Sequence, residues 1–314
     1  MSADLAVVVG GISLKNPILT ASGTCGYGLD LEPFLDLGAL GGVVVKGLSM
    51  KPRAGNRAPR VVETPAGMLN SIGLQNIGAE AFVRDKLPLL RARGITVIAN
   101  IFGFTIEEYA EVAAFLDGHE GIAGLEVNIS CPNVKEGGIE IGTSPGETHK
   151  CIAAVRRSTR LPVIAKLTPN VTDIVLLARA ARDAGADAVT LINTLVGMSI
   201  DVRTRRPHLA TATGGLSGPA IRPVAVAMVH KVRSALDVPI LGCGGVVRVE
   251  DALELIIAGA SAVQVGTATY LDPGTAGRLP GELAAWCAAA GVKSVTELIG
   301  SLDLGARPEE GHTG

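Results

Sequence analysis

The chain has 314 residues, of which 47% are hydrophobic and 18% charged, and its formal net charge is −2. This length allows a large core in one to three domains, and the small charge gives no electrostatic reason to expect nucleic acid or an anionic membrane as partner. The five cysteines show no Cys-x-x-Cys spacing, so we expect no disulfide framework, structural zinc or other metal site held by this chain alone. The N-terminus lacks a basic signal-peptide start and no apolar run could span a bilayer, which predicts a soluble, cytoplasmic protein.

The chain begins with a predicted hairpin and continues as a repeated unit. Residues 6–9 and 12–14 are apolar strands joined by Gly10 and Gly11, and we expect this hairpin to cover one end of the domain. A short apolar strand, a polar or glycine residue, a loop and an amphipathic helix then recur. The eight expected strands are residues 18–21, 42–45, 96–99, 124–127, 163–167, 188–192, 240–242 and 262–265. Their continuous apolar runs are typical of strands buried on both faces.

Helical spacing of apolar residues lies between these strands. The expected helices are residues 79–93, 106–116, 145–158, 173–184, 221–236 and 250–258. One strand–helix–strand unit, residues 161–189, is echoed at nearly the same period by residues 238–263. Eight such units predict an α/β fold, a (β/α)8 TIM barrel. The rival doubly wound sheet would normally carry Gly-x-Gly-x-x-Gly after its first strand, and this motif is absent there.

Long segments follow the second, fourth and sixth predicted strands. Residues 49–75 and 194–219 are much longer than ordinary connections, and residues 134–142 form a glycine-containing loop. Such loops at the C-terminal side of a barrel usually build the active site. We expect one domain over residues 1–305 and a disordered polar tail over residues 306–314.

Polar or glycine residues close every predicted strand, and in a barrel they would gather at one rim. They are Ser22, Lys46, Asn100, Asn128, Lys166, Asn193, Thr194, Gly244, Gly245, Gly266 and Thr267. A single strand-end lysine is explained simply, since its stem can cover apolar surface while its head stays in water. Two lysines and three asparagines beside buried residues would be desolvated without partners unless a polar ligand covers them.

The glycines after the seventh and eighth strands occupy positions where barrels often bind phosphate through backbone N–H groups. Each pair alone is explained as a tight turn, whereas both together favour a phosphorylated ligand. Lys166 would stabilise negative charge on the ring of that ligand. Flavin mononucleotide (FMN) meets this description, because its reduced ring is anionic.

Cys131 follows the fourth predicted strand, between Asn128 and Asn133 and ahead of the glycine-containing loop. A lone cysteine is most often a small buried hydrophobe, and its reactivity depends on its surroundings. The polar rim on which this thiol would lie favours a reactive role over a bound ligand.

Three motifs together resemble the dihydroorotate dehydrogenase family, over residues 14 to 304. They are NISCPN at residues 128–133, NSIGLQN at residues 70–76 and TGGLSGPA at residues 213–220. The resemblance implies a flavin-containing barrel that oxidises (S)-dihydroorotate to orotate in de novo pyrimidine biosynthesis. A cysteine at position 131 resembles class 1 enzymes, and Gln75 resembles the NAD-linked branch, class 1B. That branch implies a partner subunit with FAD and a [2Fe-2S] cluster, in a heterotetramer built on a homodimer of this chain.

The same resemblance implies the roles of individual residues. Cys131 would be the general base that takes the C5 proton of dihydroorotate. The residues implied for FMN are Ser22, Lys46, Gly47, Asn100, Asn128, Lys166, Ile192, Gly218, Gly244, Gly245, Gly266 and Thr267. The residues implied for substrate are Lys46, Asn70, Ser71, Ile72, Gly73, Leu74, Asn128, Asn193 and Thr194. The loop over residues 132–143 would close over the substrate and exclude water.

Three alternatives stay open from the sequence: a fumarate-linked class 1A dihydroorotate dehydrogenase, a dihydropyrimidine dehydrogenase subunit and a ligand-binding barrel without catalysis. Co-purification of an iron–sulfur flavoprotein would argue against the first. Substrate choice separates the second, because orotate carries a carboxylate and uracil does not. Absence of bound flavin would favour the third.

Overall fold

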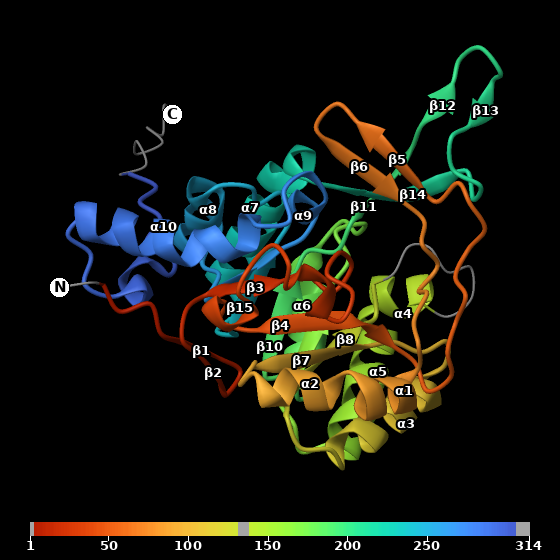
Figure 1. Cartoon of the computed structure of the whole chain (residues 1–314), viewed down its shortest axis with the longest axis horizontal. Helices are drawn as coiled ribbons and strands as arrows, with labels where there is room; N and C mark the ends of the chain where they lie inside the picture. The colour runs from red at the N-terminus through yellow and green to blue at the C-terminus, as the bar shows by residue number, and fades with distance from the viewer. Residues whose placement is uncertain (1–2, 131–137, 306–314) are drawn as a thin grey trace, which may run out of the picture.

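The computed structural model describes residues 3–130 and 138–305 (Figure 1). Within these ranges, eight parallel strands form one sheet in the order β3-β16-β15-β10-β9-β8-β7-β4. The strands are β3 (Ile18–Thr20), β4 (Val43–Leu48), β7 (Val97–Ile101), β8 (Ile122–Asn128), β9 (Val163–Lys166), β10 (Ala188–Leu191), β15 (Ile240–Cys243) and β16 (Ala262–Val265). Nearly all of their residues are buried, as strands covered on both faces require.

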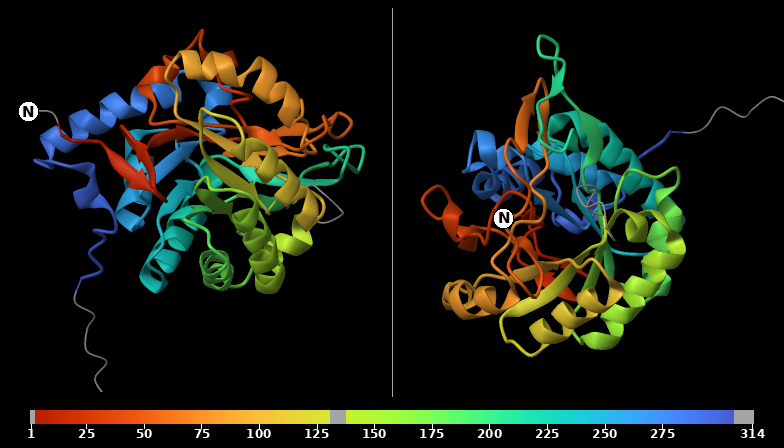
Figure 2. Two further views of the ribbon diagram at one scale, coloured as in Figure 1. Left: turned by 90° about the horizontal axis from the view of Figure 1, so that it is seen from below. Right: turned by 90° about the vertical axis from the view of Figure 1, so that its right-hand side faces the viewer.

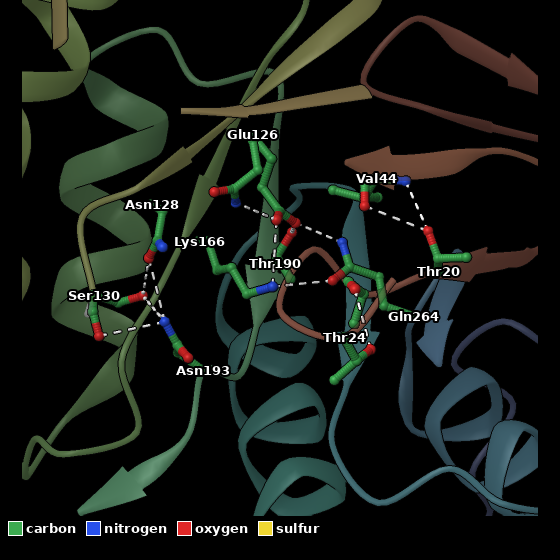
Figure 3. Close-up of polar contacts among 12 residues, drawn as sticks. Thr20, Thr24, Val44, Glu126, Asn128, Ser130, Lys166, Thr190, Asn193 and Gln264 are labelled. Carbon is green, nitrogen blue, oxygen red and sulfur yellow. Dashed lines mark hydrogen bonds and ion pairs between the residues drawn. The ribbon is translucent and has the colours of Figure 1, made fainter. Parts of the chain in front are cut away.

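The sheet closes on itself between β3 and β4. Leu19 pairs with Gly42 in a parallel bridge. The hydroxyl of Thr20 extends this junction, because its Oγ1 accepts a hydrogen bond from the Val44 N–H at 3.0 Å (Figure 3). The predicted (β/α)8 barrel is therefore confirmed, and its strand bounds agree with the prediction to within three residues.

Helices cover the outside of the barrel (Figure 2). They are α1 (Ala79–Asp85), α2 (Leu87–Ala92), α3 (Ile106–Asp117), α5 (Pro145–Ser158), α6 (Ile174–Asp183), α7 (Arg222–Ala235), α8 (Val249–Ala258) and α10 (Thr275–Ala289), and shorter helices α4 (Gly138–Thr143) and α9 (Ala268–Leu271) follow β8 and β16. Side-chain oxygens of Thr105, Ser144 and Asp173 accept hydrogen bonds from backbone N–H groups in the first turns of α3, α5 and α6. Among the described residues, no helix is long and apolar enough to cross a membrane.

The helical predictions differ from the structure in four places, since the short helices α4 and α9 were not predicted either. The helix expected over residues 79–93 is divided into α1 and α2, because Pro88 in the first turn of α2 has no N–H to donate to the carbonyl of Arg84. Helix α10 was not predicted, since Gly277, Pro280 and Gly281 interrupt its helical pattern.

The N-terminal hairpin closes the end of the barrel where the strands begin. It consists of β1 (Val7–Val9) and β2 (Ile12–Leu14), which pair antiparallel. A Cβ atom added to Gly124 near the start of β8 would lie 2.6 Å from Ile12 Cδ1, and one added to Gly10 would lie 3.1 Å from Asp187, just before β10. This close packing confirms the predicted cover over one end.

The long segments after β4 and β10 form a second sheet away from the hairpin (Figure 1). Its antiparallel strands are β5 (Val61–Thr64), β6 (Gly67–Asn70), β11 (Leu195–Met198) and β14 (Thr213–Ser217), in the order β11-β14-β6-β5, and a small hairpin of β12 (Ile200–Asp201) and β13 (Arg206–Pro207) projects beyond it. Asn70 pairs with Gly215, so two insertions that are distant in sequence meet beside the barrel. The sequence predicted the insertions but not this pairing.

Candidate active site

A cavity lies where the barrel strands end, bounded by the insertions and by the loops after β15 and β16. All twelve residues predicted to hold FMN line it: Ser22, Lys46, Gly47, Asn100, Asn128, Lys166, Ile192, Gly218, Gly244, Gly245, Gly266 and Thr267. Eight of the residues predicted to hold substrate also line it: Lys46, Asn70, Ile72, Gly73, Leu74, Asn128, Asn193 and Thr194. The barrel topology thus brings together side chains from strand ends that are far apart in sequence.

Ser71 is the one predicted substrate residue in the described chain that does not line this cavity. It is 1% exposed. Its hydroxyl lies 2.5 Å from Thr211 Oγ1 and accepts a hydrogen bond from Asn56 Nδ2 at 3.1 Å. The side chain of Ser71 therefore ties the two insertions together.

Cys131, the predicted general base, lies outside the described residues, as do residues 132–137 of the loop predicted to close over the substrate. Residues 138–143, expected as the rest of that loop, form helix α4 instead. The catalytic role of Cys131 stays a prediction. Asn128 and Ser130, which come just before it, are described and form part of a polar group at the cavity.

Three polar side chains form what we call the rim cluster (Figure 3). Asn128 ends β8, Ser130 follows it, and Asn193 comes two residues after the end of β10. Asn193 Nδ2 donates to Ser130 Oγ at 2.8 Å and to Asn128 Oδ1 at 3.2 Å. Tyr109 from α3 donates its hydroxyl proton to the Asn128 carbonyl at 2.9 Å. The cluster is neutral. Ser130 is buried, whereas Asn128 and Asn193 are partly exposed and line the cavity, where their amides offer both donors and acceptors to a polar ring.

Deeper in the barrel lies the inner network, which is centred on the carboxylate of Glu126 (Figure 3). Oε1 accepts from Asn100 Nδ2 at 2.7 Å and from Lys166 Nζ at 3.3 Å. Oε2 accepts from Thr190 Oγ1 at 2.8 Å and from Gln264 Nε2 at 2.5 Å. Five strands contribute one residue each, and both charged side chains are almost completely buried.

Charge is retained in the inner network despite this burial. Burial alone would raise the pKa of Glu126, but the Lys166 ammonium and the hydrogen bonds to the carboxylate outweigh it and lower that pKa. Burial alone would lower the pKa of Lys166, but the Glu126 carboxylate outweighs it and raises that pKa. The pair is therefore a carboxylate and an ammonium across the neutral range.

The cavity fits a flavin nucleotide in two respects. Asn100 Oδ1 is buried and has no hydrogen-bond partner among the described residues, although buried acceptors are normally paired. A Cβ on Gly47 would lie 2.8 Å from this oxygen, so a side chain at position 47 would crowd it. At the predicted phosphate end, Gly244 and Gly245 have φ values of 135° and 80°, which favour glycine.

Sequence reasoning missed the inner residues Glu126, Thr190 and Gln264. Each lies inside a strand whose other residues, apart from Asn128 at the end of β8, are apolar or small. The available signal was a single charged or amide side chain in the middle of a buried strand, which requires a partner. Among the described residues, no group of three or more His, Cys, Asp or Glu side chains is arranged to hold a metal ion.

Comparison with known proteins agrees with the geometry of the cavity. The sequence model described as dihydroorotate dehydrogenase matches residues 4–286. This chain belongs to the dihydroorotate dehydrogenase family. It is similar to proteins named dihydroorotate dehydrogenase B (NAD(+)), catalytic subunit, from Geobacter sp. strain M21 and from Citrifermentans bemidjiense. Each is 56% identical over 301 residues, covering 96% of this chain and 99% of the relative.

A relative of the same name from Geobacter sulfurreducens is 54% identical over 301 residues, with the same coverage of both chains. The resemblance to dihydroorotate dehydrogenase that three short motifs indicated is therefore confirmed, and so is its NAD-linked branch. Within this family, the cavity at the barrel mouth is the candidate active site.

Proposed function

We propose that this chain is the catalytic subunit of an NAD-linked dihydroorotate dehydrogenase that oxidises (S)-dihydroorotate to orotate in de novo pyrimidine biosynthesis. The observation that carries the proposal is the cavity itself. In a member of this family, it combines a buried ammonium, an amide oxygen that has no hydrogen-bond partner among the described residues, and a rim of neutral amides. Relatives that are more than half identical over nearly their full length bear this name.

FMN is the cofactor proposed for this chain, and when bound it would supply the two-electron acceptor for the hydride that leaves C6. Lys166 and Asn100 would hold the edge of its ring. Gly244, Gly245 and Gly266 would approach its phosphate through their backbone, where a side chain would interfere. The remaining predicted residues, Ser22, Lys46, Gly47, Asn128, Ile192, Gly218 and Thr267, line the space between or beside these groups.

The substrate would lie against the rim cluster and the first insertion. Asn128 and Asn193 would hydrogen-bond the pyrimidine edges, and the ammonium of Lys46 would attract the carboxylate. Cys131 would take the C5 proton, which leaves the C5–C6 double bond of orotate in the product. Because a free thiol has a pKa of about 8.5, the thiolate population should rise with pH through the neutral range.

A partner subunit with FAD and a [2Fe-2S] cluster is proposed to carry electrons onward to NAD, in a heterotetramer built on a homodimer of this chain. The relatives' name, catalytic subunit, supports a partner. An exposed apolar row along β11, β12 and the residue after β12 also supports assembly: Val196, Met198, Ile200 and Val202 are 50% to 84% exposed. We propose a cytoplasmic location, because a reducing compartment keeps a catalytic Cys131 as a thiol.

Product formation tests the proposal. The purified chain should convert dihydroorotate to orotate with an artificial electron acceptor, and should reduce NAD only when co-expressed with the partner subunit. Turnover of dihydrouracil in place of dihydroorotate would instead indicate a dihydropyrimidine dehydrogenase. Efficient use of fumarate by the chain alone would indicate the class 1A enzyme.

A further inference from the structure

Glu126 contacts the cavity only through other residues. It is 0% exposed and does not line the cavity. Its Oε1 atom nevertheless accepts hydrogen bonds from two residues that do line it, Asn100 at 2.7 Å and Lys166 at 3.3 Å. One buried oxygen thus connects two groups that face the ligand space.

The charge of Glu126 settles how the neighbouring amides are turned. A carboxylate only accepts hydrogen bonds, so the NH2 group of Asn100 must face it and the Oδ1 atom must point away. Gln264 is fixed in the same way from both sides, because its Nε2 donates to Glu126 at 2.5 Å while its Oε1 accepts from Lys166 at 3.1 Å. If the oxygen and nitrogen of either amide were interchanged, the amide oxygen would face the Glu126 carboxylate, and two acceptors would then lie together.

Lys166 retains one donor for a ligand. Its ammonium has three N–H groups, and two of them are directed to Glu126 and Gln264. Within residues 3–130 and 138–305, no third acceptor contacts Nζ, and the side chain lines the cavity. The remaining N–H is therefore available on the cavity side.

We propose that Glu126 is a positioning residue, which holds one donor (Lys166 Nζ–H) and one acceptor (Asn100 Oδ1) toward the pyrimidine edge of a bound flavin ring. That edge carries carbonyl oxygens beside a ring N–H, so a fixed donor–acceptor pair complements it. The inference rests on the proposed binding of FMN. It adds that recognition of the ring depends on a carboxylate that does not touch the ring.

The other titratable groups near Lys166 cannot replace this carboxylate. Among the described residues, they are Cys243 from β15 and Cys25 from the loop after β3. Burial raises the pKa of Cys243 and raises that of Cys25 to about 11, so both thiols stay neutral near pH 7. Lys46 from β4, which interacts with Cys25, is itself a cation. Glu126 is thus the anion that keeps the Lys166 ammonium protonated.

Glu126→Gln tests the proposal with the visible spectrum of bound FMN, recorded without substrate. Once the carboxylate is lost, burial should lower the pKa of Lys166 below the ordinary value of a lysine. The variant should then show a pH-dependent change of the flavin spectrum that the wild-type chain lacks. This change should disappear in Glu126→Gln/Lys166→Met, which has no amine to titrate. The dissociation constant of FMN should rise about tenfold or more, because Lys166 and Asn100 are no longer fixed.

Thr190→Val is the matched control. It removes a hydrogen bond to the same carboxylate but leaves the contacts of Glu126 with Lys166 and Asn100 in place. The FMN dissociation constant should change by less than about threefold, and no spectral titration should appear. A general disturbance of the barrel interior would instead affect this variant as strongly as Glu126→Gln.

Glu126→Asp keeps the inference testable if the glutamine variant does not fold. The shorter carboxylate keeps its charge but cannot reach Asn100 and Lys166 together, so FMN should bind more weakly without any new titration. The inference would be overturned if Glu126→Asp bound FMN as tightly as the wild type. It would also be overturned if Glu126→Gln bound FMN as tightly as the wild type and its flavin spectrum showed no change with pH. A wild-type chain that binds FMN but is not reduced by dihydroorotate would refute the proposed reaction and leave this inference standing.

Discussion

The inner network and the rim cluster are two polar groups built on the same strand, yet their chemistry differs. Glu126 and Asn128 are two residues apart on β8 and therefore point to the same side of the sheet. The deeper of the two is a fully buried carboxylate paired with Lys166. The outer one is a partly exposed amide that shares hydrogen bonds with Ser130 and Asn193.

This difference indicates what each group can do. A buried ion pair is costly to separate, so its partners stay together and hold a fixed arrangement. Neutral amides at the edge of a cavity can give up hydrogen bonds to each other and form hydrogen bonds to a ligand instead. This exchange costs little free energy, because water and substrate offer equivalent hydrogen bonds. We therefore expect the inner network to fix the cofactor and the rim cluster to bind and release the substrate.

The largest effect on catalysis is expected from replacing Cys131, which directly follows Ser130 of the rim cluster in the sequence. Cys131→Ser should lower the rate of substrate-driven flavin reduction at neutral pH by about 10²–10⁴-fold, because serine is a far weaker base than a thiolate. FMN content should not change. In the wild type, the rate measured by anaerobic stopped flow should rise with pH until the thiolate dominates. Equal rates in variant and wild type would remove Cys131 from the base role.

The next largest effect should separate the inner network from the rim. Lys166→Met leaves the Glu126 carboxylate buried without its cation, so the free energy of unfolding should fall by about 3–5 kcal/mol at pH 7. FMN binding should weaken as well. Urea unfolding of the flavin-free chain measures the loss, and the double variant Glu126→Gln/Lys166→Met should recover most of it.

The pH dependence of that loss has a definite sign. In the wild type, the pKa of Glu126 is lowered, so its stabilisation is present above the ordinary glutamate pKa and is lost as pH falls through the lowered value. In Lys166→Met, burial without the ammonium should raise the pKa of Glu126. As pH falls, Glu126 is then protonated in the variant before it is protonated in the wild type, and this removes the unpaired buried charge that destabilises the variant. The difference in the free energy of unfolding between the wild type and Lys166→Met should therefore narrow as pH falls. A difference that widens would contradict the ion-pair account.

A smaller and more selective effect is expected from the rim. Asn193→Ala removes donors to Asn128 and Ser130 that the substrate is proposed to use. The half-saturating concentration of dihydroorotate should rise about tenfold, the equivalent of one lost hydrogen bond. The FMN dissociation constant should stay close to that of the wild type. Loss of flavin in this variant would show that the two polar groups do not have separate roles.

Ser71→Ala should have the smallest effect on catalysis. Its hydroxyl is directed to Thr211 and Asn56, away from the cavity. Stability should fall by about 1 kcal/mol, while the half-saturating substrate concentration should change by less than about twofold. A change as large as that of Asn193→Ala would place Ser71 in substrate binding after all.

The barrel and its rim were predictable because each depends on local sequence. Fully buried parallel strands read as continuous apolar runs, and the residues that end them must meet at one end of a closed sheet. This is why the sequence alone assigns Lys46, Asn100 and Asn128 to one site. The glycines after β15 and β16 were found for the same reason.

The remaining features depend on partners that are distant in sequence. Glu126 and Gln264 are 138 positions apart and meet only across the barrel interior, and within their own strands each looks like an exception in an apolar run. The pairing of β6 with β14 joins two insertions in the same way. The division between α1 and α2 has a local signal in the sequence, Pro88. The prediction nevertheless gave one helix, because the apolar spacing continues across this proline.

The anaerobic visible spectrum of the purified chain, recorded before and after one equivalent of dihydroorotate, tests the central claim most directly. The account predicts an oxidised flavin spectrum that bleaches on addition of the substrate, and a Glu126→Gln/Lys166→Met variant that holds the flavin more weakly. A flavin that stays oxidised with dihydroorotate but bleaches with dihydrouracil would contradict the proposed reaction. A chain that binds no flavin, alone or with its partner, would contradict the assignment of the cavity as well.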